Sequence, residues 1–390
     1  MNELAKYIDF GQGVANPGYF RVSFDSQKNV FEVGEKLTIG FIGGSITQGS
    51  LSSTPQKCYA YLVYEWWVRT FPQAEFKYVN AGIGGTTSQF GVARAQDDLL
   101  DAEPDFVIAE FSVNDESTGH FEETYEGLVR KILSSKSHPA LMLVHNVCYN
   151  NGASAELVHS RIARHYNIPS VSMQSTLYKA LLNCRFDNRR ITPDDLHPND
   201  CGHELVSMVI TKRLEQIKNT VKAEYETAKS QRAAAQPDAG AAALLPEPLT
   251  ANAYEDSVRY QNYNSTPELD GFKADRSEQR DITDCFKKGF TASGNGAGIT
   301  FKVKGSCIAV QFRKTIHKPA PVAVAVIDGD EANAVTLDAN FDETWGDKLE
   351  LYTLLEHGGN KEHTVQIKLV KTSEADASEF YLVSVIASGH

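Results

Sequence analysis

The chain has 390 residues, which at roughly 150 residues per domain suggests two domains, or three at most. Hydrophobic residues make up 42% and charged residues 23%, a composition that supports a folded core and argues against disorder, a collagen-like helix or a coiled coil. The 38 Lys and Arg against 50 Asp and Glu leave a net charge of −12, which disfavours nucleic acid and anionic membrane surfaces as partners.

The amino-terminal segment MNELAKYIDFGQGV carries charges where a signal peptide needs an apolar stretch, and no later run approaches the ~18 apolar residues of a membrane-spanning helix. We therefore expect a cytoplasmic protein, or a secreted one if a leader has been removed. The cysteines form no C-x-x-C pair, and no histidines cluster at zinc spacing. Reduced, buried thiols and a protein without metal or other cofactor are expected, and homo-oligomerisation stays open.

Residues from about 37 to 220 alternate short β-branched runs with longer amphipathic segments, which is typical of a parallel sheet with crossover helices. Strands are predicted at 37–43, 76–80, 105–111, 140–146 and 169–173. Helices are predicted around 57–70, 88–102, 121–135 and 154–167, with a last one from Asp200 past Leu214 toward Lys229. Residues 1–230 are therefore predicted to form one α/β domain with its core at about 35–220.

The composition changes at 231–252, where Ala, Pro and Gly dominate and no amphipathic period survives, so this stretch is interpreted as a linker. Beyond it the pattern has period two: every second residue is apolar in ITFKVKG (299–305) and in HTVQIKL (363–369). The pair Asp328-Gly329 is a turn signal. Residues 253–390 are predicted to form an antiparallel β-sandwich.

The first chemical motif is GGSITQG (43–49), directly after the first strand. A serine on such a glycine-flanked turn can expose its hydroxyl and its own N–H toward one small volume, which makes Ser45 a candidate nucleophile. A phosphate-binding loop is disfavoured because Ser50 and Leu51, and not Lys-Ser or Lys-Thr, follow Gly49. A plain turn with an N-capping serine stays open for this motif alone.

The second motif is DDLHPN (194–199), just ahead of the last helix. A histidine base needs a carboxylate on its other ring nitrogen, and Asp194, three residues before His197, can curl back to supply it, whereas Asp195 is expected to point away. The alternative is a surface loop in which Asp200 caps the next helix and His197 is merely solvated.

Two further segments follow strands. NAGIGGTTS (80–88) offers backbone N–H groups that can approach a ligand oxygen closely, and EFSVND (110–115) offers the Asn114 side-chain amide. Each has an ordinary explanation as a turn. All of these motifs, however, lie at the carboxyl ends of predicted parallel strands, the edge at which open α/β sheets bind ligands. A nucleophile, a base with its acid and two oxyanion donors together indicate acyl transfer.

These blocks resemble those of the SGNH hydrolases, the GDSL-like esterase and lipase superfamily, over roughly residues 35–215. The resemblance implies an SGNH-type, flavodoxin-like three-layer fold, with Ser45 as nucleophile, His197 as base and Asp194 as its partner. It also implies an oxyanion hole made of Ser45, Gly85 and Asn114. Gly44 stands where the family's name motif has Asp, and GGSIT variants are similar to the carbohydrate esterases of the superfamily.

An SGNH domain followed by a jelly-roll-like sandwich is similar to polysaccharide deacetylases with a carbohydrate-binding domain. This predicts an esterase for acetylated oligosaccharides or polysaccharides such as mannan or xylan. The alternatives are a lipase or thioesterase for other acyl esters, and an inert carbohydrate-binding protein. Candidate sugar contacts are Trp345, in the polar stretch NFDETWGDK, together with Tyr149 and Gln48.

Overall fold

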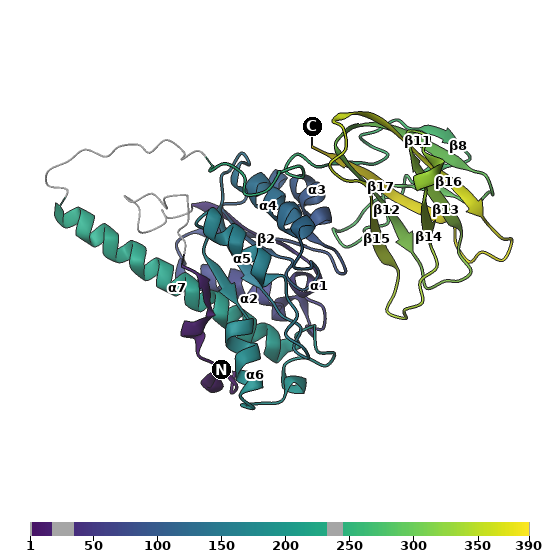
Figure 1. Ribbon diagram of the computed structural model, residues 1–390. Helices are drawn as coiled ribbons and strands as arrows, with labels where there is room; N and C mark the ends of the chain where they lie inside the picture. The colour runs from purple at the N-terminus through teal and green to yellow at the C-terminus, as the bar shows by residue number, and fades with distance from the viewer. Residues whose placement is uncertain (1, 18–34, 232–244, 390) are drawn as a thin grey trace. The chain divides into compact units, whose positions relative to one another are not determined.

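The computed structural model describes residues 2–17, 35–231 and 245–389 (Figure 1). The chain divides into two compact units, Met1–Gly91 with Ala95–Ala251, and Val92–Arg94 with Asn252–His390. Of the predicted linker, residues 232–244 lie outside the described residues. No helix in the described part of the chain combines the length and the apolar character needed to cross a bilayer.

The first unit is built on a sheet whose parallel strands lie within a few residues of the predicted positions. Its strands are β1 (Val14–Asn16), β2 (Lys36–Gly43), β3 (Glu75–Gly82), β4 (Phe106–Glu110), β5 (Ala140–His145) and β6 (Ser170–Ser172), in the order β1-β6-β5-β4-β2-β3. Strand β1 pairs antiparallel with β6 and was not predicted, since three residues carry no period. Apart from that edge strand, the sheet is the parallel, flavodoxin-like one expected.

Helices cover both faces of this sheet (Figure 1). They are α1 (Ser45–Gln48), α2 (Tyr59–Thr70), α3 (Ser88–Asp98), α4 (Gly119–Leu133), α5 (Glu156–His165), α6 (Lys179–Leu182) and α7 (Asp200–Gln231). Short helical turns lie at Ala5–Tyr7, Phe10–Gly13, Pro55–Lys57, Leu100–Ala102, Gln174–Tyr178 and Asn188–Arg190. Phe41 and Met142 pack with Trp67 of α2 and Val206 of α7. On the opposite face, Tyr125 of α4 donates to the Ala109 carbonyl. The sheet and the helices on its two faces therefore form three layers.

The strand order places β2 between β3 and β4. The chain therefore leaves β2 toward one side of the sheet and returns on the other side, and this reversal is the point at which open α/β sheets bind ligands. Ser45 follows β2, and Asn114 lies in the loop that follows β4, so both motifs lie at this reversal.

The second unit is a sandwich of two antiparallel sheets, as predicted (Figure 1). One sheet has the order β15-β12-β17-β10-β9, with β7 also paired to β17, and the other has the order β14-β13-β16-β11-β8. The strands are β7 (Val258–Tyr260), β8 (Glu268–Asp270), β9 (Lys273–Ala274), β10 (Phe290–Ala292), β11 (Gly298–Gly305), β12 (Cys307–Lys314), β13 (Val322–Ile327), β14 (Val335–Asp338), β15 (Lys348–Leu355), β16 (Lys361–Lys371) and β17 (Phe380–Ser388), with a helical turn at Glu331–Asn333. The alternating residues Phe301 and Ile367 face a shared core with Phe312 and Phe380.

The turn predicted at Asp328 and Gly329 ends β13, and both residues have positive φ. The Asp328 carboxylate accepts the Thr364 N–H and contacts Lys361 and His363. These interactions lower the pKa of Asp328 to about 2. Because the folded-state pKa of Asp328 is below its unfolded-state pKa, the ionised carboxylate stabilises the folded protein at any pH above the unfolded-state pKa. That stabilisation disappears as the pH falls toward 2.

We expect Asp328→Asn to destabilise the sandwich unit by up to ~1 kcal/mol at pH 7, because the site is partly exposed to solvent. The difference from the unsubstituted protein should be less than half as large at pH 2.5, between the unfolded-state and folded-state pKa values of Asp328. Urea unfolding at the two pH values measures it, with Asp270→Asn, on the exposed strand β8, as the control. An equal deficit at both pH values would contradict the expectation.

Candidate active site

Ser45 lies on a tight turn between β2 and α1. Strand β2 ends at Gly43, helix α1 begins at Ser45, and Gly49 with φ of +100° ends that helix. The end of β3 approaches α1 so closely that a Cβ on Gly82 would lie 2.2 Å from the Gln48 nitrogen. Glycine at position 82 is therefore required to bring the 80–88 segment against the 43–49 motif. Ser45 itself is 7% exposed.

The structure brings Ser45, His197 and Asp194 together. His197 Nε2 lies 2.8 Å from Ser45 Oγ, and His197 Nδ1 lies 2.7 Å from Asp194 Oδ2. Asp194 Oδ1 also accepts the N–H groups of Leu196 and His197, which is the curled turn expected from the spacing. Burial alone would raise the pKa of Asp194, but these hydrogen bonds outweigh it and hold that pKa below its usual value. The geometry is that of a nucleophile, a base and an orienting acid.

Contacts outside these three residues hold the 194–197 turn. Asp195 has φ of +68° and points away from His197, as expected, and its carboxylate accepts from Arg189 and Asn188. Its carbonyl accepts the Tyr149 N–H at 2.7 Å. The alternative in which Asp200 caps the helix does not hold, because its carboxylate accepts from Ser53, while Asn199 Oδ1 accepts the Gly202 N–H.

His203 supports the turn that follows Ser45, and no signal in the sequence singled it out. It is buried on α7, where its ring accepts the Tyr59 N–H at Nδ1 and faces the Ser50 carbonyl with Nε2 at 3.2 Å. Burial lowers the pKa of His203 to about 4, so the ring is neutral and Nε2 is its donor. A histidine on an amphipathic helix carries no sequence signal for such a role.

Glu110 supports the loop that carries Asn114. It is fully buried at the end of β4, and its Oε1 accepts both the N–H and the hydroxyl of Ser112. Burial raises the pKa of Glu110 to about 7, although the hydrogen bonds from Ser112 act to lower it. The Asn146 N–H donates to Ser112 Oγ, so the loop after β4 is also joined to the end of β5.

Two backbone N–H groups and one amide are free to form an oxyanion hole. Gly84 donates to Gln48 Oε1 at 2.6 Å, whereas the N–H groups of Ser45 and Gly85 donate to nothing in the part of the chain that the structure describes. Oδ1 of Asn114 is enclosed beside Gly44 without a partner, which leaves its amide nitrogen as the accessible end. A Cβ on Gly84 would lie 3.5 Å from Ser45 Cβ, so the 80–88 segment borders Ser45.

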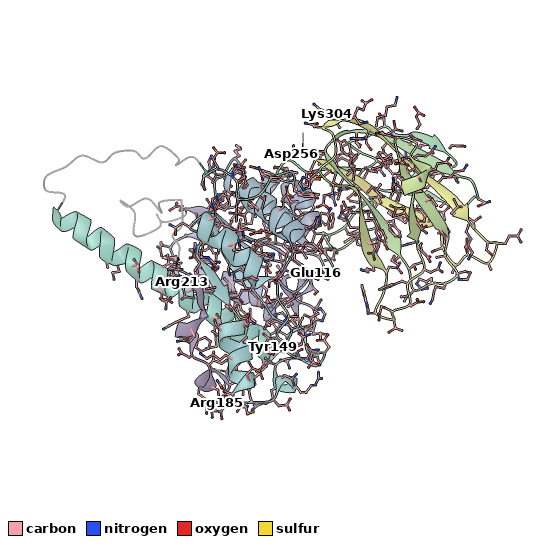
Figure 2. All side chains as sticks on the ribbon, in the orientation of Figure 1. Glu116, Tyr149, Arg185, Arg213, Asp256 and Lys304 are labelled. Carbon is pink, nitrogen blue, oxygen red and sulfur yellow. The ribbon has the colours of Figure 1, made fainter. Side chains whose placement is uncertain are left out.

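The expected sugar contacts have different surroundings. Tyr149, labelled in Figure 2, is 5% exposed and packs into the core of the α/β unit, so its ring offers no face to a sugar, and the stacking role predicted for it is wrong. Gln48 is exposed, but its side-chain oxygen holds Gly84. Trp345, between β14 and β15, is 61% exposed and contacts Phe341 edge to face. Over the described ranges, no three His, Cys, Asp or Glu side chains gather as a metal site.

Comparison with known proteins identifies the family. The sequence model of the GDSL-like Lipase/Acylhydrolase family matches residues 41–205. A two-domain esterase active on acetylated mannans has a crystal structure that is 58% identical, covers 98% of this chain and 99% of its own, and has a TM-score of 0.89. The chain belongs to the GDSL-like, or SGNH, family. As a member of this family it is a carboxylic ester hydrolase.

The relatives of this GDSL-like protein differ in what they act on. The acetylated-mannan esterase has also been co-crystallised with mannopentaose, with the same identity and TM-score, and that structure covers 98% of both chains. The Escherichia coli protein named thioesterase 1/protease 1/lysophospholipase L1 is 25% identical over 193 residues, which are 47% of this chain and 85% of that protein.

Proposed function

We propose that the protein is a serine esterase that removes O-acetyl groups from oligosaccharides or polysaccharides of the mannan or xylan type. The observation that carries the proposal is the hydrogen-bonded series Ser45, His197 and Asp194 at the ligand-binding edge of the sheet. The choice of acetylated glycan is supported by the 58% identical esterase, which is active on acetylated mannans.

In the proposed reaction Ser45 Oγ attacks the ester carbonyl while His197 Nε2 accepts its proton. Asp194 stabilises the resulting imidazolium and fixes the ring orientation. The oxyanion accepts hydrogen bonds from the N–H groups of Ser45 and Gly85 and from the Asn114 amide. His197 then protonates the leaving sugar hydroxyl as its C–O bond breaks. Water, deprotonated by His197, attacks the acetyl-enzyme, and acetate and free Ser45 are released.

The substrate class is tested by comparing acetate release from acetylated mannan and acetylated xylan with hydrolysis of p-nitrophenyl esters of increasing chain length. We expect release from at least one polymer, and a kcat/KM that falls from acetate to octanoate. A maximum at octanoate without acetate release would favour a thioesterase or lipase activity, the alternative kept open by the E. coli relative. Polymer binding without any hydrolysis would favour an inert binding protein.

Trp345 is proposed as a sugar-stacking side chain, because a flat, exposed indole in a polar loop can cover one face of a sugar ring. Trp345→Ala should raise KM for the acetylated polymer about 3- to 10-fold and leave p-nitrophenyl acetate hydrolysis unchanged. The control is Tyr263→Ala, which removes another exposed aromatic ring of the same unit. An unchanged KM for the polymer would exclude this role.

A further inference from the structure

Asp115, which directly follows Asn114, joins the two loops of the candidate oxyanion hole. Its Oδ1 accepts the Ser88 N–H at 2.9 Å. Ser88 is the first residue of α3 and stands three positions after Gly85. The N-cap residue Thr87 makes no capping hydrogen bond with its own side chain. The cap of α3 is therefore supplied by the loop after β4, where the helix dipole favours a carboxylate.

The other oxygen of the same carboxylate is held by His159 of α5. His159 Nε2 lies 3.1 Å from Asp115 Oδ2, and both side chains are completely buried. The imidazole stacks on Tyr125 with 3.6 Å between ring centroids, which fixes its plane. Its Nδ1 is buried and has no hydrogen-bond partner among the described residues. Nε2 is therefore the ring nitrogen that donates to the Asp115 carboxylate.

Within the described residues each oxygen of Asp115 thus has one donor, and the carboxylate is completely buried. Removing the His159 donor would leave a buried carboxylate oxygen without a hydrogen bond, which is strongly unfavourable. The loop can recover part of that cost only by moving Asp115 toward another donor. Asn114 would move with it, since the two residues are adjacent. A displacement of about 1 Å at a reacting centre can cost on the order of 10² in rate.

We propose that Asp115 and His159 are positioning residues that hold the Asn114 amide and the Gly85 N–H in register with each other. The inference rests on the oxyanion hole of the proposed function. Neither side chain reaches the surface, so neither can contact the substrate. Both act by holding in place the loops that carry Asn114 and Gly85.

The test compares His159→Leu, which removes the donor at similar volume, with His159→Gln, whose amide nitrogen can take the place of Nε2. His145→Leu is the matched control, because His145 is equally buried and makes no side-chain hydrogen bond in the described structure. On p-nitrophenyl acetate we expect His159→Leu to lower kcat about 10- to 100-fold with KM within about 2-fold. His159→Gln should recover kcat to within about 3-fold, and His145→Leu should leave it within about 2-fold.

A second arm introduces His159→Leu into an Asn114→Ala protein. The loss of kcat should then be at least ~3-fold smaller than in the unsubstituted background, because one of the positioned donors is already absent. An equal loss in both backgrounds, an equal loss in His145→Leu, or full kcat in a folded His159→Leu protein would overturn the proposal. If the leucine variant does not fold, His159→Asn, whose amide is too short to reach Asp115, takes its place with the same expectation.

These outcomes separate the inference from the function on which it rests. Full kcat in Asn114→Ala would overturn the oxyanion hole itself, and the positioning role with it. A reduced kcat in Asn114→Ala together with full kcat in His159→Leu would overturn only the positioning role.

Discussion

Ser45→Ala should lower kcat on p-nitrophenyl acetate by ~10³-fold or more, because the attacking oxygen is lost and no acyl-enzyme can form. The change removes one oxygen from a largely buried site whose backbone is held by β2 and α1. The far-ultraviolet circular dichroism spectrum and the melting temperature should therefore change little. Steady-state kinetics and thermal unfolding of the same preparation measure both expectations.

The matched control is Ser52→Ala, since Ser52 is a serine of the next turn whose hydroxyl donates only to the Gly49 carbonyl. Its kcat should stay within about 2-fold. A phosphonate ester should add its mass to the unsubstituted protein and to Ser52→Ala, but not to Ser45→Ala. Labelling of Ser45→Ala, or activity within 10-fold of the unsubstituted protein, would contradict the assigned nucleophile.

Gly44→Ala should lower kcat ~10²- to 10³-fold through a residue that takes no part in the chemistry. A Cβ at position 44 would lie 2.2 Å from Asn114 Oδ1, closer than two such atoms can approach. Gly44 has φ of −85°, which any residue can adopt, so the methyl group does not strain its own backbone. The Asn114 side chain is the part that can move. We expect it to rotate away, so that its amide no longer donates to the oxyanion. Stability should change by less than about 1 kcal/mol, because a terminal amide rotates at little cost.

A double-mutant cycle isolates this mechanism. Asn114→Ala alone should lower kcat by a similar factor, and adding Gly44→Ala to it should have an effect of less than about 3-fold, because the displaced group is already absent. Gly119→Ala, at a position where an added Cβ contacts nothing, controls for the methyl group. Additive losses would show that Gly44→Ala acts on something other than Asn114.

The predictions that succeeded rest on regularities that are local in the chain. Buried parallel strands are near-continuous apolar runs, and their motifs must share one sheet edge because parallel strands end on the same side. Asp194 and His197 lie within one turn, so their contact follows from the spacing. Strand β1 escaped prediction because it is defined only by its partner β6.

The predictions that failed concern surroundings that no local pattern encodes. The sequence predicts that Tyr149 faces a sugar, but tertiary packing buries its ring, and its backbone N–H holds the 194–197 turn. The alternative in which Asp200 caps the helix fails for the same reason, since Ser53, 147 residues away in the sequence, is the partner of its carboxylate. Which donor a carboxylate finds depends on the segments that folding brings beside it.

By itself, the sequence predicted an α/β unit followed by a sandwich, and it located the candidate nucleophile, base, acid and oxyanion donors, since each is a short motif tied to the end of one element. Only the tertiary structure decided how these motifs are held. The contact of Gly44 with Asn114, and the placement of Asp115 between Ser88 and His159, join segments far apart in the chain. The physical reason is that the position of a buried polar group depends on which distant donor satisfies it, and that pairing exists only in the folded protein.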